Sequence, residues 1–180
     1  MAFVLFTSMT IFAQFSTDLE TGFVQTQYND VRLPGETGSP ISLKDDLKGS
    51  PDFFYRIRCN YQINDKHLIS VLYAPLSLQY SGKINRDVYY GGELFEANSE
   101  INARYMFNSY RLTYRYMKVN NDRWKFGYGL TIKVRDAIIE LKSEDKVAGL
   151  ANVGPVPIIN FYLSYSVSGP FTLVLDGDAL

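Results

Sequence analysis

The chain has 180 residues, which is enough for one domain with its own core or for a small closed barrel. Its formal net charge of -1 at pH 7 creates no overall field that would attract nucleic acid, so we expect no nucleic-acid partner. The single cysteine, Cys59, excludes an internal disulfide and a cysteine-based metal site. Tyrosine (14) and phenylalanine (12) are abundant, which suits strands at an interface.

The chain begins with an almost wholly apolar run, MAFVLFTSMTIFAQ. The run is too short to cross a bilayer as a helix, and it ends at Ala13, just before a polar segment. This pattern predicts an export signal peptide over residues 1–13, clipped at its start because no basic residue precedes the apolar run. The alternative is an N-terminal core strand that buries Phe3, Leu5 and Phe6.

Seven segments with the alternation of β-strands follow, and no helix is predicted. They cover residues 19–30, 52–63, 67–81, 101–118, 123–141, 156–168 and 171–180. In the second segment, FFYRIRCNYQI, large apolar side chains occupy every second position and polar side chains lie between them. Each such strand has two chemically opposite faces.

The connections between these segments alternate in length. Three are tight and rich in turn-forming residues, at 64–66, 120–122 and 168–170. The other three are long and polar, at 31–51, 82–100 and 142–155. In an up-and-down meander, alternate connections lie at opposite ends, so this order predicts tight turns at one end and long loops at the other.

This asymmetry resembles the small bacterial outer-membrane β-barrels of about eight strands, which have short periplasmic turns and long extracellular loops. The resemblance implies an all-β fold: an up-and-down antiparallel transmembrane β-barrel over residues 14–180, located in the outer membrane of a Gram-negative bacterium. Closed bacterial barrels have an even number of strands, so seven strands predict a chain truncated at its C-terminus. The alternative is that the long fourth segment merges two strands.

Periodicity alone does not say which face of the strands meets water. The export signal favours a lipid-facing apolar surface, as do aromatic side chains too bulky for a narrow lumen. Aromatic residues beside the tight turns also match a periplasmic girdle. We expect this girdle to contain Tyr61, Tyr116, Trp124, Tyr165 and Phe171. The third segment is apolar on both faces, as a buried soluble strand would be.

With the apolar face toward lipid, the lumen is expected to be basic. Its lining would comprise Arg56, Arg58, Arg111, Arg115, Lys125, Lys133 and Arg135. Asp176 and Asp178 on the seventh segment would oppose these cations. The cluster is either a path or site for anions or an ionic network that fills the lumen. We favour the network, because buried charges must be paired.

No catalytic, cofactor or metal site is predicted. The single histidine, His67, lies at the tight-turn end, whereas the lipid A and protease enzymes among outer-membrane barrels work at the outer end. The sequence also lacks a glycine-rich phosphate loop, a metal-ligand cluster and a GxSxG motif.

We therefore expect a non-enzymatic, monomeric outer-membrane barrel whose long loops serve a structural or surface-interaction role. Its partners would be membrane lipid and lipopolysaccharide, together with a loop partner that the sequence does not identify. One alternative is a small pore or carrier for small solutes, and another is a secreted soluble barrel that binds lipid. Acidic loop residues would form a solvated rim or bridge to lipopolysaccharide through divalent cations: Asp87, Glu93, Glu96 and Glu100.

Overall fold

The computed structural model describes residues 14–179, which form an antiparallel all-β structure without helices. Its strands are β1 (Phe15–Val24), β2 (Asp30–Val31), β3 (Ile41–Ser42), β4 (Lys48–Gly49), β5 (Asp52–Asn64), β6 (His67–Ala74), β7 (Ser77–Lys83), β8 (Val88–Tyr90), β9 (Glu93–Phe95), β10 (Glu100–Asn120), β11 (Trp124–Lys142), β12 (Val147–Ser168) and β13 (Phe171–Ala179). The predicted export signal, residues 1–13, lies outside the described part. Within residues 14–179, no helix is long and apolar enough to cross a membrane.

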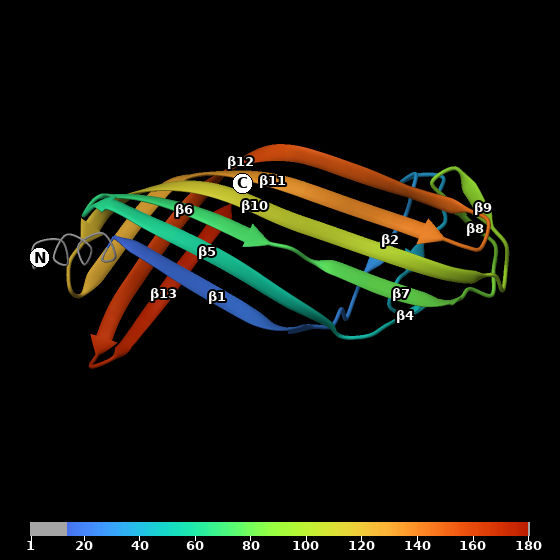
Figure 1. Cartoon of the computed structure of the whole chain (residues 1–180), viewed down its shortest axis with the longest axis horizontal. Coiled ribbons are helices and arrows are strands. Elements are labelled where there is room, and N and C mark those ends of the chain that lie inside the picture. Colours follow the sequence, from blue (N-terminus) through green and yellow to red (C-terminus); the bar gives the residue numbers. More distant parts are fainter. Residues whose placement is uncertain (1–13, 180) are drawn as a thin grey trace, which may run out of the picture.

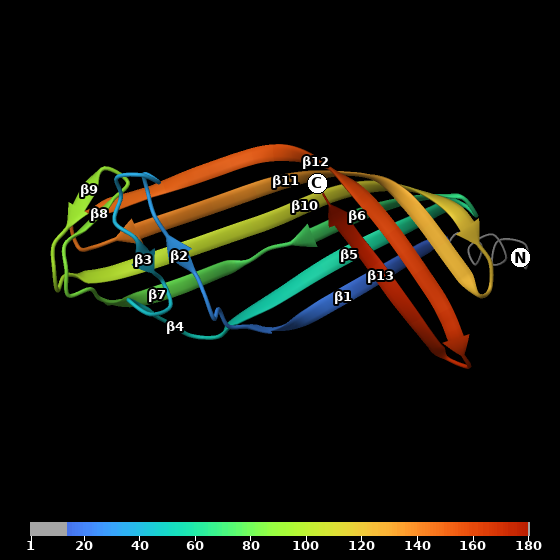
Figure 2. The same ribbon diagram turned by 180° about the vertical axis from the view of Figure 1, so that it is seen from behind.

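The long strands form one curved sheet in the order β1-β5-β6-β10-β11-β12-β13. Figures 1 and 2 show this curved sheet from opposite sides. It is curled into a half-barrel that turns through 238°. β10 is a single strand of 21 residues, so the alternative that it merges two strands is wrong. In the described residues, β1 and β13 end this order, and β4 pairs with β7 at the loop end of the same sheet.

The third predicted strand is present in two pieces, β6 and β7, which pair with successive parts of β10. The break falls at Pro75, which has no N–H to donate to a neighbouring strand. Phe107 of β10 bridges the break, because its N–H donates to the carbonyl of Leu76 at 2.8 Å. The row of strands therefore continues past the interruption.

Three tight turns lie at one end of the sheet, here called the turn end. The side-chain oxygen of Asn64 accepts the N–H groups two and three residues further on, at 2.9 and 3.1 Å. Asn121 does the same in the second turn, at 3.1 and 2.8 Å. Gly169 in the third turn has a φ of 56°, a conformation that glycine adopts without a steric penalty. The short connections predicted from turn residues are therefore present.

The opposite end, here called the loop end, differs from the prediction in two ways. β1 stops at Val24, short of the predicted residue 30. The predicted long loop at 142–155 is only the turn 143–146, because β11 and β12 extend to Lys142 and Val147 and pair along their whole length. The glycine and alanine residues of this segment indicate a loop, but the strand pairing satisfies their backbone groups.

The sheet has one concave face, which is identified by side chains that meet across it. Arg58 on β5 forms an ion pair of 2.5 Å with Asp176 on β13, although four strands lie between β5 and β13. Two such side chains touch only where the sheet curls toward them. Because successive residues of a strand point to opposite faces, these contacts fix the inward or outward direction along the regular stretches of each strand.

The long strands have two halves of opposite polarity, here called the turn half, next to the turn end, and the loop half, next to the loop end. Near the turn end of β10, Tyr110, Leu112 and Tyr114 point outward and are exposed, whereas Asn102 and Arg104 point outward near the loop end. The inward residues of β10 change in the reverse sense, from Arg115, Thr113 and Arg111 near the turns to Ala103 and Ile101 near the loops. β11 shows the same reversal, with Leu130 outward in the turn half and Leu141 inward in the loop half.

The two long connections, residues 25–51 and 84–99, fold together on the concave face at the loop end, and we call them the cap (Figure 1). They contain β2, β3, β4, β8 and β9. The cap and the sheet share one buried apolar core, formed by Val31, Ile41, Leu43, Leu47, Leu78, Tyr80, Ile84, Val88, Tyr90, Phe95, Ile101, Ala103, Leu141 and Ala148. The inward face of the loop half is apolar because the cap covers it.

Polar contacts join the two segments of the cap to each other. Arg86 pairs with Asp46 at 2.7 Å and donates to the carbonyl of Pro40 at 2.9 Å. The Ser39 N–H donates to the carbonyl of Tyr89 at 2.8 Å. Tyr90 is 1% exposed, and burial raises the pKa of its hydroxyl to about 12. The cap is therefore packed inside, while the acidic residues expected to form a solvated rim are all exposed: Asp87, Glu93, Glu96 and Glu100.

Candidate functional site

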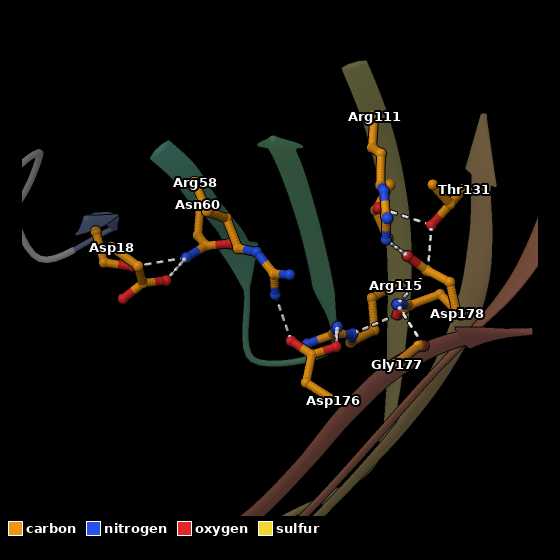
Figure 3. Close-up of polar contacts among 12 residues, drawn as sticks. Asp18, Arg58, Asn60, Arg111, Arg115, Thr131, Asp176, Gly177 and Asp178 are labelled. Carbon is orange, nitrogen blue, oxygen red and sulfur yellow. Dashed lines mark hydrogen bonds and ion pairs between the residues drawn. The ribbon is translucent and has the colours of Figure 1, made fainter. Parts of the chain in front are cut away.

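The concave face of the turn half carries a network of ion pairs (Figure 3). Asp176 lies between two arginines: it accepts from Arg58 Nη1 through Oδ2 and from Arg115 Nη2 through Oδ1, both at 2.5 Å. Arg115 is buried, and its Nε donates to Asn160 Oδ1 at 2.7 Å. Its guanidinium also lies 4.6 Å from the ring centre of Tyr162. A buried cation needs this complete set of partners, because one left unpaired is strongly destabilising.

Asp178 is the second anionic centre of the network. Its Oδ2 accepts from Arg111 Nη1 at 2.5 Å, and its Oδ1 accepts from Thr131 and Asn160, both at 2.9 Å. Thr131 is fully buried and also bonds the hydroxyl of Thr113 at 2.7 Å. Both oxygens of Asp178 are therefore engaged by protein groups. The pattern fits an internal framework that holds β10, β11, β12 and β13 together.

All seven basic residues predicted to face a lumen lie on the concave face by their register. Four of them have carboxylate partners: Arg58, Arg111 and Arg115 in the network, and Arg56, which pairs with Glu20 at 2.5 Å. The other three are Lys125, Lys133 and Arg135. Within residues 14–179, none of these three has a carboxylate in salt-bridge distance.

The convex face carries the aromatic residues predicted as a girdle beside the turns. Trp124 and Tyr165 pack with ring centres 4.3 Å apart, and Arg123 donates to the Tyr165 hydroxyl at 2.8 Å. Tyr116 packs edge-on against Tyr128, with ring centres 5.8 Å apart. The remaining two, Tyr61 and Phe171, are exposed at the same end of the sheet.

A second aromatic cluster lies further along the strands. Tyr73 and Tyr110 stack with ring centres 5.2 Å apart, and Tyr55 meets Tyr73 edge-on at 6.1 Å. Exposed aliphatic residues separate this cluster from the aromatic residues near the turns: Ile57, Val71, Leu112, Leu130 and Ile132. Along the strands, an aliphatic zone is therefore bordered by aromatic residues on both sides.

His67 belongs to the aromatic group at the turn end. Its Nδ1 lies 2.6 Å from the Tyr114 hydroxyl, and its ring stacks on Tyr114 with centres 5.9 Å apart. The Tyr116 ring is tilted against the His67 ring, with ring centres 5.5 Å apart. No carboxylate or serine is among the polar contacts of His67 in the described part of the chain. The geometry gives His67 a packing role.

Among the described residues, no group of three or more His, Cys, Asp and Glu side chains could hold a metal ion. The acidic cap residues predicted to bridge to lipopolysaccharide therefore form no such cluster in this part of the chain. Asp87 instead accepts the N–H of Ala97 at 2.9 Å, which orders the second segment of the cap. Cys59 is half-buried and makes one weak contact, with Thr17 at 3.9 Å.

Sequence reasoning predicted the cations and the opposing Asp176 and Asp178 but missed the neutral members of the network. Asn160, Thr131 and Tyr162 complete the hydrogen bonding of the buried charges. Their only signal in the sequence is that they occupy inward positions in strands whose outward residues are apolar. Comparison of the chain with protein-family models, curated proteins and solved structures finds no match.

Proposed function

We propose that this protein is a non-enzymatic outer-membrane β-barrel protein that holds its cap at the cell surface for a structural or surface-interaction role. The observation that carries the proposal is the reversal of polarity along β10 and β11. In the turn half, large apolar side chains are exposed on the convex face, and the ion pairs of Arg58, Arg111 and Arg115 lie on the concave face. A lipid environment stabilises this arrangement, whereas water would leave a large apolar surface exposed.

The height of the apolar zone supports the same proposal. On β11 the outward positions are apolar from Trp124 to Val134, ten residues further on. At about 3.4 Å per residue this is about 34 Å along the strand, or about 26 Å of height for a tilt of about 40°. The apolar band of outer-membrane barrels is about 25 Å tall and has aromatic residues at both borders. The aromatic groups around Tyr110 and Trp124 match these two borders.

The cap and the ion network favour a structural role over a pore. Apolar side chains of the cap fill the concave face at the loop end, and Arg58, Asp176 and Arg115 connect its two sides in the turn half. A small pore or carrier remains the alternative function, and single-channel conductance separates the two. A secreted lipid-binding barrel would need its aromatic columns inside, whereas the columns that contain Tyr110, Tyr114 and Trp124 lie on the convex face.

Cell fractionation combined with gel migration tests the proposal. We expect the protein in the outer-membrane fraction, with a denaturing-gel mobility that changes on boiling, because a closed membrane barrel resists detergent until heated. Recovery from the soluble periplasmic fraction without a heat-dependent shift would overturn the proposal. A large stable conductance in planar bilayers would instead establish the pore alternative.

A further inference from the structure

A second region of the concave face, between the ion network and the cap, has charges that the protein does not balance. A cavity of about 280 Å³ lies there, lined by the cations Arg111, Lys133 and Arg135 and by one carboxylate, Asp178. Both oxygens of Asp178 are already engaged, by Arg111 on one side and by Thr131 and Asn160 on the other. The cavity therefore contains more positive charge than its own carboxylate neutralises.

Lys133 and Arg135 are the two cations of this cavity without a carboxylate partner in the described residues. The Lys133 ammonium lies 5.2 Å from the centre of the Phe107 ring, and Arg135 donates to the side-chain oxygen of Asn152 at 3.2 Å. Both side chains point to the same face of β11, with Cα atoms about 7 Å apart at this spacing. Lys133 is partly buried and Arg135 is exposed at the rim of the cavity. Two neighbouring cations repel each other, and an anion between them removes that cost.

We propose that this cavity binds a small solute with a phosphate or carboxylate group. Lys133 and Arg135 hold the anionic group, since both donate charge-assisted hydrogen bonds to oxyanions. Phe107, Val156 and Ile158 supply apolar lining next to these cations, and this lining receives the uncharged part of the solute. The volume is near the lower limit for small-molecule sites, which restricts the solute to about the size of one ring.

This inference goes beyond the proposed function and does not depend on it. The cavity lies on the concave face whether or not the convex face meets lipid. It shares Arg111 and Asp178 with the ion network, but the arginines of the network have carboxylate partners, whereas Lys133 and Arg135 have none within residues 14–179. A failure of the membrane experiment would therefore leave the binding experiment interpretable, and the reverse also holds.

Calorimetric titration of the purified protein in detergent, at fixed ionic strength, tests the site. Phenyl phosphate is the main probe, because it carries both an oxyanion and a ring. Inorganic phosphate lacks the ring, and benzyl alcohol lacks the charge. We expect phenyl phosphate to bind more tightly than inorganic phosphate, and benzyl alcohol to give no measurable binding.

Lys133→Gln and Arg135→Gln should each weaken phenyl phosphate binding roughly tenfold or more, the effect of losing a charged hydrogen bond. Lys125→Gln is the matched control, because Lys125 also faces inward without a carboxylate partner but lines a separate cavity near the turn end. It should leave the affinity unchanged. Thermal unfolding of each variant verifies that the fold is retained.

Three results would overturn the proposal. The first is no binding of phenyl phosphate to the unmodified protein, which would mean that Lys133 and Arg135 serve only the internal structure. The second is unchanged affinity in both cavity variants. The third is an equal loss in Lys125→Gln, which would indicate a general attraction of anions by the concave face.

Discussion

The turn half and the loop half of the sheet share β10 and β11, but polar and apolar side chains occupy opposite faces of these strands in the two halves. Near the turns, β10 and β11 point aromatic and aliphatic side chains outward and enclose ion pairs. Near the loops, the same strands point polar side chains outward and bury an apolar face under the cap. The polarity of a strand face is therefore set by what covers it, and it changes where the covering changes.

The two halves also differ in how they are held together. The loop half has an ordinary apolar core, whose burial is favourable in water. The interior of the turn half depends on charges that satisfy each other, so losing one partner leaves another buried and unpaired. We expect the two halves to respond differently to substitution, and the following experiments test this from the largest effect to the smallest.

Removing the central carboxylate of the turn half should have the largest effect. Asp176→Ala leaves Arg58 and the buried Arg115 without their anion, and we expect a loss of about 3–5 kcal/mol in the free energy of unfolding. Urea unfolding in detergent measures it. Glu20→Ala is the control, because its pair with Arg56 is half exposed and contributes about 1 kcal/mol or less. Equal losses in the two variants would contradict the enclosed network.

A cavity in the core of the loop half should affect the cap first. Leu43 is fully buried, and Leu43→Ala should cost about 2–5 kcal/mol. We expect residues 25–51 to become sensitive to protease while the turn half keeps its fold. Lys44→Ala, at an exposed position next to it, should change nothing. A cap that resists protease equally in both variants would show that its apolar core does not hold it in place.

An arginine introduced on the convex face should reduce stability much more in the turn half than in the loop half. Leu130 is 64% exposed in the middle of the aliphatic zone, and Leu130→Arg should cost about 2–4 kcal/mol in liposomes. Asn102→Arg, outward in the loop half, should cost little because that surface meets water. Unfolding of both variants in the same liposomes measures the difference. Tolerance of arginine at both positions would remove the distinction between the halves.

Acid should loosen the cap through one ion pair. Arg86 donates a hydrogen bond to Asp46, which lowers the pKa of this carboxyl below its ordinary value. Its stabilising contribution is complete above about pH 4, the unfolded value, and is lost as the pH falls through the lower folded value. Both side chains are partly exposed, so we expect about 1 kcal/mol or less.

Protease resistance of the cap, measured between about pH 5 and pH 3, records this change. Arg86→Gln should reduce the resistance at neutral pH and flatten its acid dependence. An unchanged acid dependence in Arg86→Gln would assign the effect to another carboxyl group.

Much of the turn half could be predicted from the sequence. The alternation in FFYRIRCNYQI and RWKFGYGLTIKVR identifies strands with two faces, and Asn64 and Asn121 identify the tight turns. These features are local, since a period of two and a turn residue need no knowledge of the rest of the chain. The inward direction of Arg111 and Lys133 follows from the same register.

The cap could not be predicted, because its core joins residues far apart in the chain. Leu43, Tyr90 and Leu141 meet in one cluster, yet Leu43 and Tyr90 lie in polar connections, far in the sequence from Leu141 at the end of β11. The apolar character of both faces of LISVLYAPLSL has the same explanation: Val71 points outward, whereas Leu78 packs under the cap. A contact of this range has no periodic signal in the sequence.

The environment of Trp124 tests the central claim most directly, because it is the only tryptophan and lies on the convex face near the turns. The measurement is quenching of its fluorescence in liposomes that contain lipids brominated at different depths. We predict strong quenching by lipids brominated near the interface, weaker quenching by those brominated at the chain ends, and little quenching by aqueous iodide. Efficient quenching by iodide with none from brominated lipid would place the aromatic face in water and contradict the account.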